Sequence, residues 1–277
     1  MNRIISKKYI SEDLIKFEIS TSKPVKDIKP GQYIIFKLEQ SEEGYPLPVI
    51  KVDVEKETIT LIVSVTDCCN RPLADLNAGS SNFEIDGPFG DPIEIENYGT
   101  VLCIGRGPGI VPLLPVLKVL HEAGNQVISI LSAETNEGII LQNEINAASY
   151  EVIIHTDDGS KGEKGNICQV VEKVLKNNRI NHVFVIGSAK AIKETCLLTT
   201  KYNIKTQAIL HKGKPIKNGV HGIFRVTICG NVKSICVDGY NFNAWYPNFD
   251  EMLSRFGEMD LKIPARVSVL NEINVPG

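Results

Sequence analysis

The pattern of apolar and polar residues changes along the chain, and residues 1–97 carry its first form. Short runs alternate with a period of two, most clearly over 58–65, and another strand is expected over 32–38. Turn-forming residues such as Lys29-Pro30-Gly31 separate the runs. Because such alternation buries one face of a strand, short strands between turns are typical of an antiparallel barrel. We therefore expect a small β-barrel domain over residues 1–97.

Residues 98–210 show a second pattern, in which apolar strands alternate with helices. Strands are expected at 101–104, 127–131, 152–155, 183–186 and 206–210. A helix after the first strand runs to about Ala123, and another helix has an apolar face at helical spacing. The residues of that face are Ile167, Val170, Val171, Val174 and Leu175. This alternation predicts an α/β domain, a mostly parallel sheet with helices on both faces.

The last part of the chain, residues 211–277, follows neither pattern. Residues 224–228 and 232–236 can pair around Gly230-Asn231 as a hairpin, and residues 249–256 predict a short helix. The expected fold class is therefore an antiparallel β-barrel, followed by a parallel-sheet α/β domain and a C-terminal hairpin segment.

Composition narrows the classes of partner. The 277 residues suit two compact domains, and 43% apolar residues are enough to form their cores. A net charge of −3 argues against nucleic acid and an anionic membrane surface as partners. Charges interrupt the N-terminal apolar residues, unlike in a signal peptide, and the apolar run 110–120 is too short to span a bilayer. We expect a cytoplasmic protein whose seven irregularly spaced cysteines form no disulfide framework.

A glycine-rich segment, Gly105-Arg106-Gly107-Pro108-Gly109, lies between an expected strand and an expected helix. Glycines let a phosphate approach the backbone, the helix N-terminus supplies free N–H groups, and the charge of Arg106 can attract a phosphate. The alternative is a tight turn without a ligand. In this context we interpret Gly105, Arg106, Gly107 and Gly109 as candidate contacts to a dinucleotide.

A polar segment, Thr156-Asp157-Asp158-Gly159-Ser160, directly follows the strand at 152–155. Because ligands bind at the carboxyl ends of parallel strands, these residues can hydrogen-bond a ribose or a carboxamide. The alternative is an Asp-Gly turn whose polar side chains bond their own backbone. Gly187-Ser188 ends the next strand at the same edge, where a small residue such as Gly187 lets a ring or a ribose approach.

Several stretches, taken in order, carry a family resemblance. They are Lys29–Tyr33, Gly87–Gly90, Asn97–Thr100, Thr156–Ser160 with Lys164-Gly165, Cys236–Gly239 and Asn248–Glu251. On these residues the chain resembles the ferredoxin–NADP reductase superfamily over about 1–256. It is most similar there to the small (alpha) subunit of NADH-dependent ferredoxin–NADP reductase, or sulfide dehydrogenase, and to the dihydroorotate dehydrogenase electron-transfer subunit. The resemblance implies a flavin-type barrel over 1–97, an NAD(P)-binding domain over 98–210 and a degenerate iron–sulfur-type segment over 211–277.

The flavin site implied by the resemblance departs from the family pattern. The family holds FAD through an Arg-x-Pro-Leu-Ser/Thr stretch of the barrel, which matches Gly44-Tyr45-Pro46-Leu47-Pro48 here. Tyr45, Pro46 and Leu47 are therefore the implied flavin contacts, whereas glycine replaces the arginine and proline replaces the hydroxyl residue. A second flavin loop reads Asp67-Cys68-Cys69-Asn70, where the carboxylate of Asp67 repels a pyrophosphate, and the alternative is that nearby Arg71 compensates this charge. These replacements make FAD a doubtful cofactor.

The nicotinamide loop and the cluster site depart as well. The family loop is Gly-Gly-Gly-x-Gly-x-Ala-Pro, so Arg106 and Val111 replace small residues. The positions aligned with cluster cysteines are His221, Phe224 and Cys236. A 2Fe–2S cluster needs four ligating side chains, and phenylalanine cannot ligate iron. We expect an NAD(P)H site and no 2Fe–2S cluster.

Three hypotheses about function follow. The first is a flavin- and NAD(P)H-dependent oxidoreductase subunit. It would pass electrons between a nicotinamide nucleotide and a partner, either a larger flavoprotein subunit or a ferredoxin-like carrier. The second is a non-catalytic relative, a binding or regulatory subunit that keeps the fold and a nucleotide pocket without flavin or cluster. The third is an NAD(P)-binding sensor.

Overall fold

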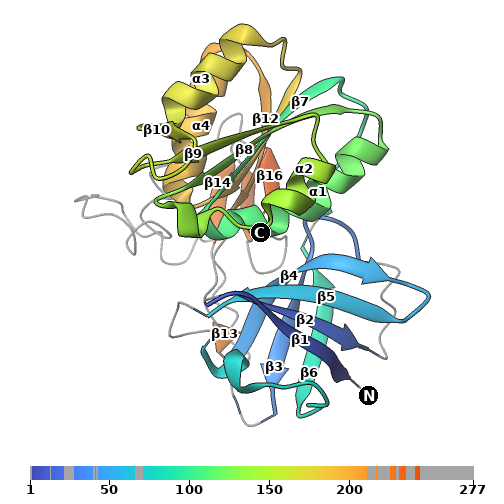
Figure 1. Ribbon diagram of the computed structural model, residues 1–277. Helices are drawn as coiled ribbons and strands as arrows, with labels where there is room; N and C mark the ends of the chain where they lie inside the picture. Colours follow the sequence, from blue (N-terminus) through green and yellow to red (C-terminus); the bar gives the residue numbers. More distant parts are fainter. Residues whose placement is uncertain are drawn as a thin grey trace, which may run out of the picture.

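The computed structural model describes residues 2–12, 14–21, 28–39, 41, 43–65, 71–90 and 92–210, and the strands at 216–217, 225–228, 231–234 and 241–243. Within these residues the chain forms two bodies, an antiparallel sheet and a parallel sheet flanked by helices (Figure 1). Both predicted fold classes are therefore confirmed.

The antiparallel sheet is barrel-like. Its strands have the order β1-β2-β5-β4-β3-β6, and each pairs antiparallel with its neighbours. They are β1 (Arg3–Ser11), β2 (Leu14–Ser20), β3 (Tyr33–Leu38), β4 (Glu43–Asp53), β5 (Thr58–Ser64) and β6 (Phe83–Phe89), with the 3-10 turn η2 (Arg71–Asp75) before β6. The N–H of Ile4 donates to the Ser80 carbonyl (2.9 Å), and the Gly79 N–H donates to the Ile4 carbonyl (2.8 Å). These bonds join the β1 edge to the segment that leads into β6, and the alternate strand residues enclose one apolar core.

The second sheet has the order β10-β9-β8-β7-β11-β12-β16 among the described residues. Its strands are β7 (Thr100–Arg106), β8 (Gln126–Ala133), β9 (Glu151–Thr156), β10 (Glu163–Lys164), β11 (His182–Gly187), β12 (Lys205–Leu210) and β16 (Asn241–Asn243). The pairs from β10 to β12 are all parallel, and only β16 runs antiparallel, along β12. The five predicted strands of residues 98–210 correspond to β7, β8, β9, β11 and β12.

Helices cover both faces of the parallel sheet (Figure 1). The helices are α1 (Ile110–Glu122), α2 (Gln142–Ala147), α3 (Ile167–Asn177) and α4 (Ala189–Lys201), with the short turns η3 (Gly107–Gly109) and η4 (Asn136–Gly138). The predicted apolar face of α3 is buried against the sheet beside α4. The helices α1 and α2 share the opposite core, which forms on the side of the barrel. The helices that come before β9 in the chain therefore cover one face of the sheet, and those that come after β9 cover the other face.

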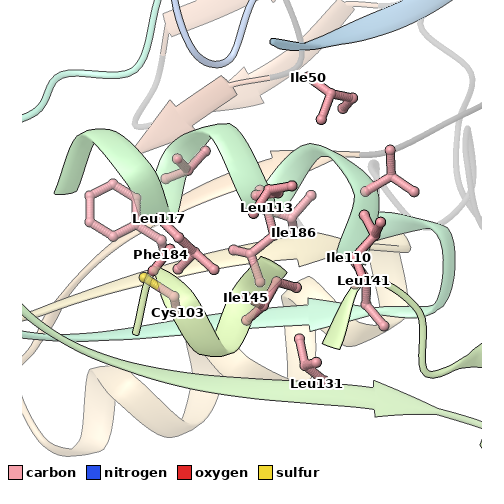
Figure 2. Packing of buried hydrophobic residues seen from close by; sticks show 14 of the residues in the cluster. Ile50, Cys103, Ile110, Leu113, Leu117, Leu131, Leu141, Ile145, Phe184 and Ile186 are labelled. Atoms are coloured by element: carbon pink, nitrogen blue, oxygen red, sulfur yellow. The ribbon is translucent and has the colours of Figure 1, made fainter. Parts of the chain in front are cut away.

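The barrel packs against α1. Figure 2 shows Ile50 of β4 on one side of this helix, and Cys103 and Leu131 of the parallel sheet on the other. The barrel residues Leu14 and Ile62 join the same buried cluster. Burial of these apolar side chains fixes β4 beside the helix that follows the glycine-rich loop.

Of the described strands after residue 210, β13 and β16 extend the two large sheets, and β14 and β15 form a separate two-stranded sheet. β13 (Ile216–Lys217) pairs with Glu43 and Gly44 of β4, while β16 extends the parallel sheet. The predicted pairing is confirmed as β14 (Arg225–Ile228) and β15 (Asn231–Ser234), but the predicted turn position is wrong, because Asn231 belongs to β15 and pairs with Ile228. The predicted helix at 249–256 lies outside the described residues. No helix among those that the structure describes is long and apolar enough to cross a membrane.

Candidate nucleotide-binding site

The glycine-rich segment joins the end of β7 to the start of α1. Gly107 has φ +54°, and a Cβ added there would meet no atom within 4 Å, so the loop is open on that side. A Cβ on Gly109 would lie 2.4 Å from the Ile186 carbonyl oxygen. Gly109 is therefore needed for close packing against β11, whereas Gly107 supplies a left-handed turn beside open space.

The loop lies at the point where the sheet order reverses. β7 has β8 on one side and β11 on the other, and the chain proceeds from β7 to β8 and later to β11. Ligands of open parallel sheets bind outside the carboxyl ends of strands at such a point. No side chain caps the N-terminus of η3 or of α1, so these helix starts offer a positive dipole end to an anion. Gly187, predicted as a contact, ends β11 at this same edge.

A pocket of about 400 Å³ opens beside the loop. It lies between the ends of β7, β9 and β11 and the first turns of α3 and α4. Its polar lining residues are Arg106, Asp157, Asn166, Ser188, Lys190 and Glu194. Two of these side chains are cationic and two are anionic, so the lining has no net charge at neutral pH.

Arg106 and Asp157 form a bidentate ion pair at the pocket. Nη2 of Arg106 is 2.6 Å from Oδ2 of Asp157, and Nη1 is 3.1 Å from Oδ1. The side chains are 25% and 41% exposed. The hydrogen bond from Arg106 holds the pKa of the Asp157 carboxyl below its ordinary value, so the pair is charged at neutral pH.

Arg106 also contacts buried Ser132 and, through it, connects to buried His155. Nη1 donates to Oγ of Ser132 (2.6 Å), which lies 3.0 Å from Nδ1 of His155, and Nε2 of His155 lies 2.8 Å from the Gly165 carbonyl oxygen. Arg106 is opposite Ser132 in β8, and Ser132 is opposite His155 in β9. Register therefore places the three side chains in a row across the strands.

The segment after β9 uses most of its polar groups internally. The buried hydroxyl of Thr156 donates to the Lys161 carbonyl (2.8 Å) and accepts from the Lys161 N–H (3.0 Å). Oδ1 of Asp158 accepts from the N–H and hydroxyl of Ser160, which lowers the pKa of Asp158, and Ser160 Oγ accepts from the Asn136 N–H. Gly159 takes φ +78° in this turn.

Of the predicted Thr156–Ser160 contacts, only Asp157 lines the pocket. The hydrogen bonds of Thr156, Asp158 and Ser160 agree with the alternative interpretation of this segment, a turn whose polar side chains bond nearby protein groups. Their contact with a nucleotide stays a prediction. Gly105 and Gly109 are held by packing, since a Cβ on Gly105 would lie 2.9 Å from Leu113.

The flavin contacts implied for the barrel lie on β4. Tyr45 and Leu47 point into the barrel core and are 2% and 5% exposed, and Pro46 is buried as well. Stacking of Tyr45 on a flavin ring would require its side chain to leave that core. The stretch thus offers a flavin no guanidinium and no hydroxyl at Gly44 and Pro48. The four residues of the second flavin loop and the three aligned cluster positions lie outside the described residues: Asp67, Cys68, Cys69, Asn70, His221, Phe224 and Cys236.

Sequence reasoning missed several residues of the site. Ser132 and His155 support Arg106, while Asn166, Lys190 and Glu194 line the pocket. Ser132 had a usable signal, because it follows the strand predicted at 127–131 at the carboxyl edge of the sheet. His155 ends the strand predicted at 152–155. Asn166, Lys190 and Glu194 come from the cap of α3 and the first two turns of α4, whose distance from the glycine-rich loop depends on tertiary packing.

Comparison with known proteins finds relatives of the same kind over most of the chain. The chain is 32% identical over 258 residues to the "dihydroorotate dehydrogenase B (NAD(+)), electron transfer subunit homolog" of Thermotoga maritima, covering 93% of this chain and 91% of that protein. It is 29% identical to the electron transfer subunit of dihydroorotate dehydrogenase B from Enterococcus faecalis, over 70% of this chain and 75% of that protein. A solved structure of the NADH-dependent reduced ferredoxin-NADP oxidoreductase, described for flavin-based electron bifurcation, matches with a TM-score of 0.83 and 30% identity over 93% of both chains. No protein-family model matches the chain.

Proposed function

This chain belongs to the family of dihydroorotate dehydrogenase B electron transfer subunits and their homologues, and on that premise we propose that it transfers electrons between a nicotinamide nucleotide and a partner redox protein. The observation that carries the proposal is the pocket at the switch point of the parallel sheet, next to the open glycine-rich loop. Its volume of about 400 Å³ lies within the range of small-molecule sites.

Each part of the nucleotide can be matched to the residues whose chemistry suits it. The backbone of Gly105, Gly107 and Gly109 and the uncapped start of α1 suit the pyrophosphate, because they offer donors and a positive dipole end. The ionised Asp157 suits the hydroxyls of a ribose. Gly187 leaves room for a ring at the end of β11. No acid–base residue is needed, because a nicotinamide donates a hydride without a proton from the protein.

Flavin is the expected hydride acceptor in this family, and the printed title of one relative refers to flavin-based electron bifurcation. The described β4 residues do not fit that role, since Gly44 and Pro48 lack the charge and the hydroxyl, and Tyr45 is buried in the barrel core. We therefore derive no step through a flavin. This misfit favours the second candidate function, a non-catalytic subunit that binds a nicotinamide nucleotide and regulates a partner.

The partner is proposed from the names of the relatives. They are called electron transfer subunits, and one belongs to an oxidoreductase that acts on reduced ferredoxin and NADP. We propose either a larger flavoprotein subunit or a ferredoxin-like carrier for this chain. Co-purification of the full chain with a second flavoprotein polypeptide from its source cells would support the first of these.

One experiment on the full chain, purified without oxygen, tests these proposals. Nucleotide binding is followed by the fluorescence of NADH and of NADPH, and bound flavin by the visible spectrum. A yellow protein that NADH bleaches supports the electron-transfer function. A colourless protein that binds NADH, and stays colourless after incubation with excess FAD, supports the non-catalytic candidate. Absence of binding by either nucleotide refutes both.

A further inference from the structure

Below the pocket, four groups form a hydrogen-bond chain whose direction is fixed at both ends. The Gly165 carbonyl can only accept, so Nε2 of His155 carries a hydrogen and donates across 2.8 Å. With the hydrogen on Nε2, Nδ1 is free to accept, and the hydroxyl of Ser132 lies 3.0 Å away as the donor. The guanidinium of Arg106 can only donate, so Ser132 Oγ accepts from Nη1. Every group therefore has a partner of the right kind.

The chain connects two walls of the pocket. One end is Arg106 with Asp157, and the other is Gly165, the residue before the Asn166 cap of α3. Between them, Ser132 and His155 are both 0% exposed and reach neither the solvent nor the pocket. In such a buried setting each hydrogen bond is strong, and a lost partner is costly.

Arg106 needs such support because of its place in the loop. It directly precedes Gly107, whose outer side is open, and it is a long side chain where the family has glycine. Ser132 and Asp157 together engage both terminal nitrogens and hold the guanidinium across β8 and β9. Without them the free side chain can fold back over the open side of Gly107.

We propose that Ser132 and His155 are positioning residues for the nucleotide site. They fix the guanidinium of Arg106 away from the glycine-rich loop, and they tie it to the Gly165 turn that forms the opposite wall. The ligand concerned is the nicotinamide nucleotide of the proposed function, on which this inference rests. Neither residue touches the ligand.

The test compares two serines of the same strand. Ser132→Ala removes the link between Arg106 and His155. Ser129→Ala is the matched control, because Ser129 is also 0% exposed and its hydroxyl bonds the Ser149 hydroxyl, at 2.8 Å, away from the pocket. The dissociation constant of NADH is measured by fluorescence, and the unfolding midpoint is measured for each variant.

We expect Ser132→Ala to weaken NADH binding by about tenfold, as for loss of one charge-assisted bond, while Ser129→Ala changes it by less than about twofold. Ser132→Thr, which keeps a hydroxyl, should recover most of the affinity. His155→Gln can donate to Gly165 from its amide nitrogen, placed near the position of Nε2, but has no acceptor at the position of Nδ1, so it should bind NADH as weakly as Ser132→Ala. If Ser132→Ala does not fold, His155→Gln tests the same hydrogen-bond link.

A second measurement does not depend on the ligand. Side-chain ¹⁵N NMR of the unmodified protein should find the His155 hydrogen on Nε2. A hydrogen on Nδ1, NADH affinity unchanged in Ser132→Ala and His155→Gln, or an equal loss in Ser129→Ala would overturn the positioning role alone. If the unmodified protein binds no nucleotide, the proposed function fails, and this inference fails with it.

Discussion

His182 should make the stability of the protein depend on pH. It begins β11, with the ring of Tyr98 at 4.3 Å and that of Phe184 at 4.7 Å. Within the part of the chain that the structure describes, its Nε2 is buried without a hydrogen-bond partner. Burial lowers the pKa of His182 to about 4, and the charge of Lys205 adds to the effect. The folded protein therefore resists protonation at this position.

The direction of the pH effect follows from the protonation of His182 in the folded and in the unfolded protein. Well above pH 6.5 the imidazole is neutral in both the folded and the unfolded state, so it contributes no pH dependence there. As the pH falls below 6.5, the unfolded chain gains a proton that the folded protein does not take up until about pH 4. Linkage then gives a loss of unfolding free energy of about 2 kcal/mol at pH 5 and about 3 kcal/mol at pH 4.

Urea denaturation of the unmodified protein and His182→Phe at pH 7 and pH 5 measures this loss. Phenylalanine keeps the ring stack and removes the unpaired nitrogen, so we expect little change at pH 7. Between the two pH values, the variant should lose about 2 kcal/mol less than the unmodified protein. His121→Asn is the control, because the His121 side chain is exposed in α1. Parallel losses in the unmodified protein and His182→Phe would refute the reasoning.

Three further predictions concern the site and the core. Gly109→Ala should lower the unfolding free energy by about 2 kcal/mol in urea titrations, because its Cβ would meet the Ile186 carbonyl at 2.4 Å; Gly107→Asn, facing open space, should cost less. Asp157→Asn leaves Arg106 without its counter-charge, so NADPH affinity relative to NADH should rise by about tenfold in fluorescence titrations, and an unchanged ratio would contradict this. Burial raises the pKa of Cys103, so mass spectrometry should find it alkylated by iodoacetamide only after unfolding.

The fold could be predicted because its signals are local. The alternation over 58–65 appears as β5, and the apolar face from Ile167 to Leu175 appears on α3. Burial of Ile59, Leu61 and Val63 in the barrel core and of one face of α3 against the sheet determines both patterns, so the sequence alone contains them. The connection of residues after 210 to both sheets could not be predicted, because β13 and β16 are two and three residues long and are defined by the strands beside them.

The candidate site was predictable only in outline. The glycine-rich loop and the segment from Thr156 to Ser160 lie at the expected edge of the sheet. Two interpretations of that segment were equal in the sequence, since a turn and a ligand site use the same residue types. The structure separates Asp157, which lines the pocket, from Thr156 and Ser160, which bond within the loop or to its neighbours. Such differences depend on side-chain partners that lie far apart in the sequence.

The two sets of departures from the family pattern differ in kind. Arg106 replaces a glycine, but Asp157 balances its charge and Ser132 accepts one of its hydrogens, so the change is accommodated by partners across two neighbouring strands. Gly44 and Pro48 replace an arginine and a hydroxyl residue. Because neither has a polar side chain, that stretch itself offers a flavin neither a charge nor a hydroxyl. The nucleotide site at the sheet edge therefore does not depend on the β4 stretch of the barrel, and the colour of the purified protein tests whether a flavin is bound there.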